Sequence, residues 1–200
     1  MSQRLGILGG TFDPPHVGHL ILGEYAADAL QLDRLLFVPA ADPPHKRDEI
    51  HTPIEHRLAL LAAAMEDNPR FALSRVDVDR PGPHYSVDMI HLLRDQNPGA
   101  ELFFIMGADS LVSFPSWNRP LELMRACTLA VMRRPGTSFS LDMHETVLPG
   151  LAERITIIDA PLIDISSTHV AERLARGLSI RYLVTDPVRA YIEEHHLFSG

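Results

Sequence analysis

Short apolar segments alternate with helical patterns along the whole chain of 200 residues, and this alternation constrains the fold more than any other feature. The apolar segments predict strands at Arg4–Leu8, Arg34–Val38, Phe71–Val78, Glu101–Met106, Thr128–Met132 and Ile155–Ile158. Strands that alternate with helices are typical of an α/β domain with a mostly parallel sheet. The length suits one domain of ordinary size.

Helical periodicity fills the intervals between the predicted strands. The first helix is expected from about residue 17, with one apolar row at i+4 spacing formed by Val17, Ile21, Tyr25 and Ala29. The next has the start signal of a capping box, with Thr52 as cap, Pro53 in the first turn and Glu55, and runs to about Glu66. Further helices are expected at Ser86–Arg94, Ser167–Arg176 and Pro187–His195, the last with Asp186 as its cap.

Composition excludes several classes of protein. The formal net charge of -8 argues against a nucleic-acid partner bound through a broad basic surface. Cys127 is the only cysteine, so the chain can form neither an internal disulfide nor a zinc site made of cysteines. No apolar run approaches 18 residues and the N-terminus lacks a signal-peptide pattern, so we expect a cytoplasmic protein without a membrane partner. A homo-oligomer remains possible.

The segment GGTFDPPHVGHL at residues 9–20 follows the first predicted strand and leads into a helix. Open parallel sheets bind ligands beyond the carboxyl ends of their strands, which is where this segment falls. It matches neither the dinucleotide pattern G-x-G-x-x-G nor a Walker phosphate loop. Gly9 and Gly10 allow a ligand close to the backbone, and a helix N-terminus favours an anion. His16 and His19 lie three residues apart, so both imidazoles can donate to one phosphate.

Two other interpretations of the histidines stay open at this point. They could be partly exposed loop residues without a role in binding. They could also hold zinc, with His45 as a third ligand, although no carboxylate–histidine signature supports a metal site.

Residues 10–19, GTFDPPHVGH, resemble the H-x-G-H signature of a nucleotidyltransferase superfamily, and the chain is similar over nearly its whole length to the bacterial nicotinate mononucleotide adenylyltransferases. The motifs that carry the resemblance are Pro43-Pro44-His45-Lys46, Tyr85-Ser86, Met106-Gly107-Ala108-Asp109, Trp117, Arg133-Arg134-Pro135-Gly136 and Ile165-Ser166-Ser167-Thr168. One position departs from the family pattern, because Ala171 stands where an arginine is usual. Arg173 follows two residues later, on a different helix face.

The resemblance implies a Rossmann-like, doubly wound, mostly parallel sheet flanked by helices. It implies a single domain over residues 1–200 whose C-terminal helical part, from about 165 to 200, closes the phosphate site. The implied enzyme transfers AMP from ATP to nicotinate mononucleotide in NAD biosynthesis, giving nicotinate adenine dinucleotide and pyrophosphate by direct in-line displacement. Mg²⁺ would be carried by the ATP phosphates and water rather than by protein ligands.

The resemblance also assigns roles to individual residues. The implied catalytic residues are His16 and His19. The residues expected to bind ATP are Gly9, Gly10, Thr11, Phe12, His16, His19, Gly107, Asp109, Ser166, Ser167, Thr168 and Arg173. Those expected to bind nicotinate mononucleotide are Lys46, Tyr85, Ser86, Trp117 and Arg134. Arg57 is a further, weaker candidate for phosphate binding, because it lies inside a predicted helix.

Structural roles compete with several of these assignments. Ser166, Ser167 and Thr168 could only cap a helix, Asp109 could do the same, and Trp117 could belong to the core. Other functions compete as well. A sister enzyme could adenylylate pantetheine phosphate or transfer CMP from CTP at the same kind of site, and a regulator could bind nucleotide without turnover, which Ala171 alone favours.

Overall fold

The computed structural model describes residues 2–41, 52–133, 140, 143–161 and 163–198. In this part of the chain six parallel strands form one sheet in the order β3-β2-β1-β4-β5-β6. The strands are β1 (Arg4–Gly10), β2 (Arg34–Pro39), β3 (Phe71–Leu73), β4 (Glu101–Gly107), β5 (Thr128–Arg133) and β6 (Ile155–Asp159). The order reverses between β1 and β4, so the expected doubly wound, parallel α/β fold is confirmed.

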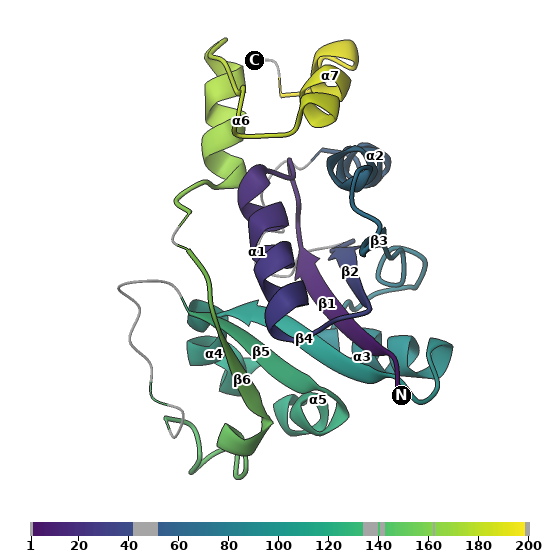
Figure 1. Ribbon diagram of the computed structural model, residues 1–200, viewed down its shortest axis with the longest axis vertical. Coiled ribbons are helices and arrows are strands. Elements are labelled where there is room, and N and C mark those ends of the chain that lie inside the picture. The colour runs from purple at the N-terminus through teal and green to yellow at the C-terminus, as the bar shows by residue number, and fades with distance from the viewer. Residues whose placement is uncertain (1, 42–51, 134–139, 141–142, 162, 199–200) are drawn as a thin grey trace.

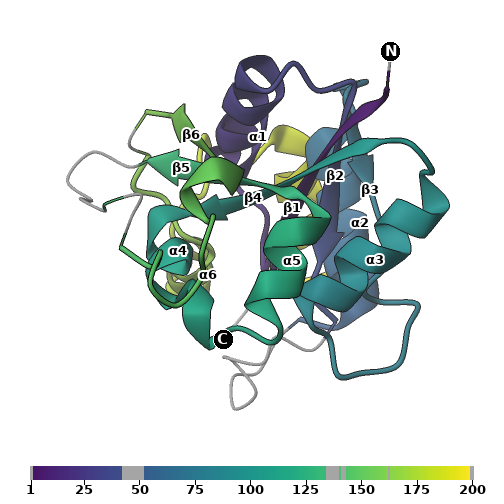
Figure 2. The same cartoon turned by 90° about the horizontal axis from the view of Figure 1, so that it is seen from below.

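Helices cover both faces of the sheet, as Figures 1 and 2 show. The α-helices are α1 (Val17–Ala29), α2 (Ile54–Met65), α3 (Ser86–Gln96), α4 (Ala108–Ser113), α5 (Pro120–Ala126), α6 (Ser167–Ala175) and α7 (Asp186–Glu194). Two 3₁₀ turns, η1 (Phe114–Ser116) and η2 (Ala152–Arg154), complete the described elements. Sheet residues alternate between the two cores: Phe103 and Ile105 of β4 join the cluster beneath α1, while Phe104 and Met106 join the cluster beneath α3 and α5.

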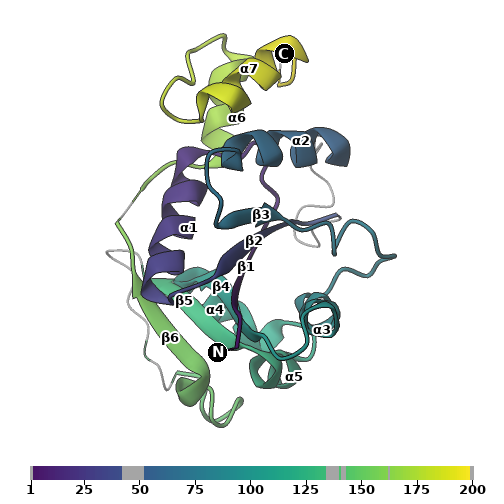
Figure 3. The same ribbon diagram turned by 45° about the vertical axis from the view of Figure 1, so that its right-hand side comes forward.

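Helix α7 packs on α2 beyond the carboxyl ends of the strands, and α6 joins them through apolar side chains (Figure 3). Their contact is a third apolar cluster, which includes Leu60 of α2, Val170 of α6 and Ile192 of α7. His56 of α2 and the Tyr191 hydroxyl of α7 add a hydrogen bond of 3.0 Å. The C-terminal part of the chain is therefore fixed to the domain beside the ends of the strands.

The predicted apolar row of the first helix was wrong. Tyr25 is 45% exposed, and α1 instead buries Gly18, Gly23, Ala26 and Ala27. A side chain at Gly23 would place its Cβ 2.9 Å from the ring of Phe71. The helix lies against the sheet through its small residues, and periodicity of large residues therefore misjudged its buried face.

Three other local predictions were also wrong. The strand predicted at Phe71–Val78 ends at Leu73, because the chain then turns, with the Asp79 amide donating to the Arg75 carbonyl. Thr52 does not cap α2, because the helix begins one residue later with Pro53 as its N-cap and no side-chain hydrogen bond caps it. Helix α7 is capped by the hydroxyl of Thr185 and not by Asp186. Among the described residues no helix has the length and apolarity to cross a membrane.

Candidate active site

The loop after β1 brings the two predicted histidines into contact. His16 is the N-cap of α1 and His19 lies in its first turn. Their rings stack, with centroids 3.7 Å apart, and the His16 N–H donates to Nδ1 of His19 at 3.2 Å. Because Nδ1 accepts this hydrogen bond, the neutral His19 ring carries its proton on Nε2. The backbone thus fixes His19 as a donor through Nε2.

Phe12 packs against His19 and supports the arrangement of the two histidines. Its backbone has φ of 50°, and its ring, 2% exposed, meets the His19 ring edge-on at a centroid distance of 5.0 Å. A Cβ on Gly10 would lie 2.9 Å from the Phe12 ring, so this position needs glycine. The Phe12 side chain packs in the core, which leaves only its backbone for the nucleotide contact that we expected of it.

Arg57 of α2 binds the same loop through a hydrogen bond to its backbone. Its guanidinium is buried and donates to the carbonyls of Thr11 and Ala40 at 3.0 and 2.8 Å, and to Thr52 at 3.1 Å. Burial lowers the pKa of Arg57, and the charge of Asp13 acts in the opposite direction. Arg57 is therefore a buried clamp between three chain segments and not the phosphate ligand that we considered.

The C-terminal part reaches the histidine loop at two points. The Ser167 hydroxyl donates to the Pro14 carbonyl at 2.8 Å, and the Val17 N–H donates to the Leu183 carbonyl at 2.9 Å. These contacts lie on either side of His16. The start of α6 is therefore held next to the histidine pair.

The hydroxyls expected at the phosphates have different surroundings. Ser166 is the N-cap of α6, and its hydroxyl accepts from the His169 N–H. Thr168, in the first turn, is exposed. Arg173 donates through Nε to the Ser179 carbonyl at 2.9 Å, which fastens the chain that follows α6.

A cavity of about 370 Å³ opens at the carboxyl ends of β1, β2 and β4, where the strand order reverses. We call it the acceptor cavity below, after the binding role that the resemblance predicts for Tyr85, Ser86 and Trp117. It is lined by Gly9, Gly10, Thr11, Val38, Ala40, Asp77, His84, Tyr85, Ser86, Met89, Phe104, Ser116, Trp117 and Asn118. It thus brings together residues expected to bind the two substrates, from segments more than 100 positions apart. This location is the general ligand-binding place of doubly wound sheets.

Trp117 packs against the core and also lines the cavity. It is partly buried, it packs against the core, and its ring meets those of Phe104 and Phe114 edge-on at 6.0 and 5.6 Å. It also lines the acceptor cavity, where a partly exposed indole can stack on a flat ring. On the facing side, Tyr85 is the N-cap of α3 and Ser86 is its first residue.

The end of β4 adds Gly107 and Asp109. Gly107 is the N-cap of α4, and Asp109 lies exposed in the first turn of that helix. No side-chain hydrogen bond caps α4, so Asp109 does not have the capping role that we weighed for it. A Cβ on Gly107 would fall 2.4 Å from the Asp109 carboxylate, so a larger residue there would require the Asp109 side chain to move.

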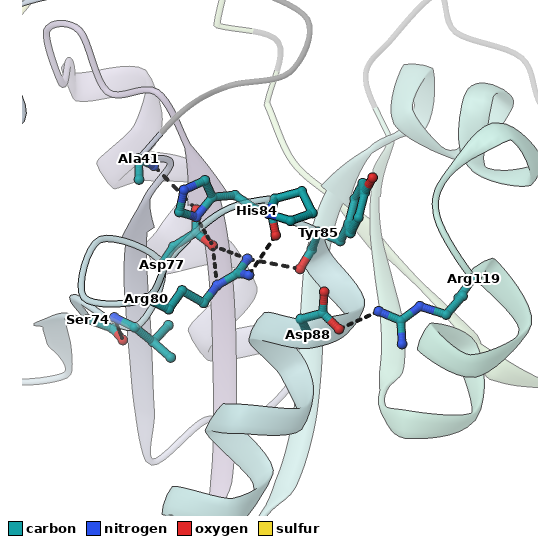
Figure 4. A network of polar contacts seen from close by, with 10 residues as sticks. Ala41, Ser74, Asp77, Arg80, His84, Tyr85, Asp88 and Arg119 are labelled. Carbon is teal, nitrogen blue, oxygen red and sulfur yellow. Dashed lines mark hydrogen bonds and ion pairs between the residues drawn. The ribbon is translucent and has the colours of Figure 1, made fainter.

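Sequence reasoning missed Asp77 and His84. Both line the acceptor cavity, and Asp77 is buried (Figure 4). Asp77 falls inside the strand predicted at Phe71–Val78, and His84 falls in the loop expected after it, so neither was singled out. Lys46, Arg134 and His45 lie outside the described residues, so the structure does not test their assignments.

The described residues contain no group of three or more His, Cys, Asp or Glu side chains that could hold a metal ion. Mg²⁺ prefers oxygen ligands and usually keeps several waters beside substrate phosphates.

The fold and the site together define a nucleotide-binding α/β protein with a histidine pair at its first helix. The family model described as cytidylyltransferase-like matches residues 7–173. Nearly the whole chain, 98%, aligns at 47% identity with 92% of a protein of Thermomicrobium roseum named as a probable nicotinate-nucleotide adenylyltransferase. A protein of Roseiflexus with the same name is 44% identical, with 98% of each chain covered. This chain therefore belongs to the nicotinate-nucleotide adenylyltransferase family within the cytidylyltransferase-like proteins.

Solved structures agree on the fold. The nicotinic acid mononucleotide adenylyltransferase of Plasmodium falciparum, complexed with NaAD, superposes with a TM-score of 0.78 at 16% identity, covering 98% of this chain and 97% of that one. The same enzyme complexed with APC gives a TM-score of 0.77.

Proposed function

We propose that this chain transfers AMP from ATP to nicotinate mononucleotide, releasing pyrophosphate and forming nicotinate adenine dinucleotide. The observation that carries the proposal is the stacked pair of His16 and His19 beside a cavity lined by Trp117, Tyr85 and Ser86. The names of relatives that align over nearly the whole chain support the same reaction.

The reaction needs alignment and charge stabilisation more than it needs a base. The attacking group is a phosphate oxygen, which is already an anion at neutral pH. It displaces pyrophosphate in line at the α-phosphorus of ATP, and one P–O bond forms as another breaks. His19, which donates through Nε2, stabilises the charge that develops on the phosphoryl oxygens, and His16 stacks against it.

The two substrates have separate places in this proposal. The ATP phosphates lie between the histidine loop and the start of α6, where helix N–H groups favour anions and Thr168 adds a hydroxyl. Mg²⁺ bound to those phosphates neutralises part of their charge. The pyridine ring of the acceptor stacks on Trp117, and Ser86 at the start of α3 donates to its carboxylate. Gly107 and Asp109 bind the ribose and adenine side of ATP in this proposal.

The remaining assignments extend this arrangement. Lys46 and Arg134 bind acceptor phosphate, and Arg173 contributes to the triphosphate site in place of an arginine at Ala171. The chain acts as one domain, with residues from about 165 onward closing the phosphate site. Cytoplasmic location and a possible homo-oligomer stay predictions.

Pyrophosphate release tests the proposed function. The purified protein receives ATP and Mg²⁺ with nicotinate mononucleotide, nicotinamide mononucleotide or phosphopantetheine, each in a separate reaction. We expect a strong preference for nicotinate mononucleotide. Turnover with phosphopantetheine alone would reject the substrate but keep the chemistry, and ATP binding without turnover on any acceptor would favour a regulator.

A further inference from the structure

The wall of the acceptor cavity contains a buried ion pair to which the reaction assigns no role. Asp77 is 6% exposed and is the one buried carboxylate in the part of the chain that the structure describes. Its Oδ1 accepts from Nε and Nη2 of Arg80 at 3.0 and 2.5 Å, and its Oδ2 accepts from the Ala41 N–H at 3.3 Å. Arg80 therefore binds Asp77 through two of its nitrogens, and the two charges balance.

The same guanidinium also holds the loop that leads into α3. Arg80 donates to the carbonyls of Pro83 and Tyr85 at 2.9 and 3.2 Å (Figure 4). This loop delivers three residues to the cavity, His84, Tyr85 and Ser86. The Arg80 guanidinium, whose side chain is 12% exposed, thus fixes both the charge of the cavity wall and the position of the segment that faces the acceptor.

His84 lies beside the pair. Its Nδ1 is 3.6 Å from Oδ1 of Asp77, and both residues line the acceptor cavity. The carboxylate of Asp77 would repel an acceptor that carries a carboxylate of its own if its charge were unbalanced, because charges inside a protein are poorly screened. Arg80 removes that repulsion, although Arg80 does not itself line the cavity.

We propose that the Asp77–Arg80 pair sets the acceptor specificity of this cavity, with Arg80 as a positioning residue that makes it accept a ring carrying a carboxylate in preference to the corresponding amide. The proposal rests on the proposed function. It attributes the choice between the acid acceptor and the amide acceptor to the balance between the charges of Asp77 and Arg80, and not only to groups that touch the ring.

The test compares two substitutions that break the same ion pair with opposite changes in charge. Arg80→Gln leaves Asp77 unbalanced, and Asp77→Asn leaves Arg80 unbalanced. For each variant, kcat/KM is measured with nicotinate mononucleotide and with nicotinamide mononucleotide, and the ratio of the two values is the readout. We expect the ratio to fall about tenfold in Arg80→Gln and to rise in Asp77→Asn.

A purely structural role predicts a different pattern, because both substitutions loosen the same loop and would shift the ratio in the same direction or not at all. Either of those outcomes overturns the proposal. The double variant Asp77→Asn/Arg80→Gln should restore a ratio close to that of the unmodified protein, since no net charge remains. Arg75→Gln is the matched control, because Arg75 is exposed and pairs with Asp79 away from the cavity, and its ratio should not change.

Arg80→Lys gives a milder version of the test. It keeps the charge and loses the forked hydrogen bonds, so the ratio should stay within about twofold of the original even if the melting temperature falls. A loss of selectivity as large as that of Arg80→Gln would contradict the proposal. The outcome is separable from the proposed function, which fails if the unmodified protein does not turn over nicotinate mononucleotide at all.

Discussion

Two arginines, the buried Arg57 and the largely buried Arg80, support the two sides of this site in different ways. Arg57 supports the ATP side, and its guanidinium donates to backbone carbonyls, including those of Thr11 and Ala40. Arg80 supports the acceptor side and donates both to the carboxylate of Asp77 and to the carbonyls of Pro83 and Tyr85. The first arrangement keeps a cation beneath the loop that we assign to a triphosphate. The second cancels its own charge, which suits a cavity that must distinguish one small substituent.

Replacing His19 by Ala should have the largest effect of the substitutions considered, and the effect should be on kcat. Loss of the Nε2 donor should lower kcat about 10²–10³-fold, with little change in the KM of either substrate or in melting temperature, because the charge it stabilises develops in the transition state. Steady-state kinetics and thermal unfolding check this. His91→Ala on α3 is the control, and wild-type rates in His19→Ala would contradict the mechanism.

Replacing Arg57 by Met should act mainly on stability. The variant leaves buried carbonyls without their donor, so the free energy of unfolding should fall by about 3 kcal/mol. Urea unfolding measures it, and the exposed Arg75→Met should change by less than about 0.5 kcal/mol. An Arg57→Met protein as stable as the unmodified one would mean that the clamp is not needed.

Trp117→Ala should affect the acceptor side alone. Loss of a stacking surface should raise the KM of nicotinate mononucleotide about tenfold and leave that of ATP within about twofold. Trp117→Phe, which keeps a ring, should be intermediate. Equal effects on both substrates would show that the two halves are not separate.

The smallest effect is expected where α6 meets the histidine loop. Ser167→Ala removes the hydrogen bond to the Pro14 carbonyl and should lower stability by about 1 kcal/mol, with a several-fold rise in the KM of ATP. Ser179→Ala, beyond the end of α6, is the control for general effects of losing a hydroxyl. A rise in the KM of nicotinate mononucleotide without a rise in the KM of ATP would contradict the assignment of α6 to the ATP phosphates.

The contact between His16 and His19 could be predicted from the sequence because the residues of this loop are neighbours in the chain. Glycines, prolines and two histidines within residues 9–20 specify a strand, a loop and a helix start directly. The acceptor half is assembled from segments that only the fold brings together, so Asp77 and His84 gave no local signal. The role of Arg57 was also hidden, since its partners are carbonyls, and a sequence does not show which carbonyls a turn leaves open.

Short elements escaped prediction for related reasons. Helices α4 and α5 have six and seven residues, which is too few for a clear helical period. Helix α4 nevertheless positions Asp109. The segment around Trp117 leads into α5 through Asn118 and Arg119. Arg119 also pairs with Asp88 in the first turn of α3, and that hydrogen bond raises the pKa of Arg119.

The intrinsic fluorescence of Trp117, the only tryptophan, tests the separation of the two substrates most directly. The protein is titrated with nicotinate mononucleotide and, separately, with a non-hydrolysable ATP analogue and Mg²⁺. Our account predicts saturable quenching by nicotinate mononucleotide and little change with the ATP analogue. Quenching by the analogue alone, in a protein that turns over nicotinate mononucleotide, would contradict the assignment of the cavity to the acceptor.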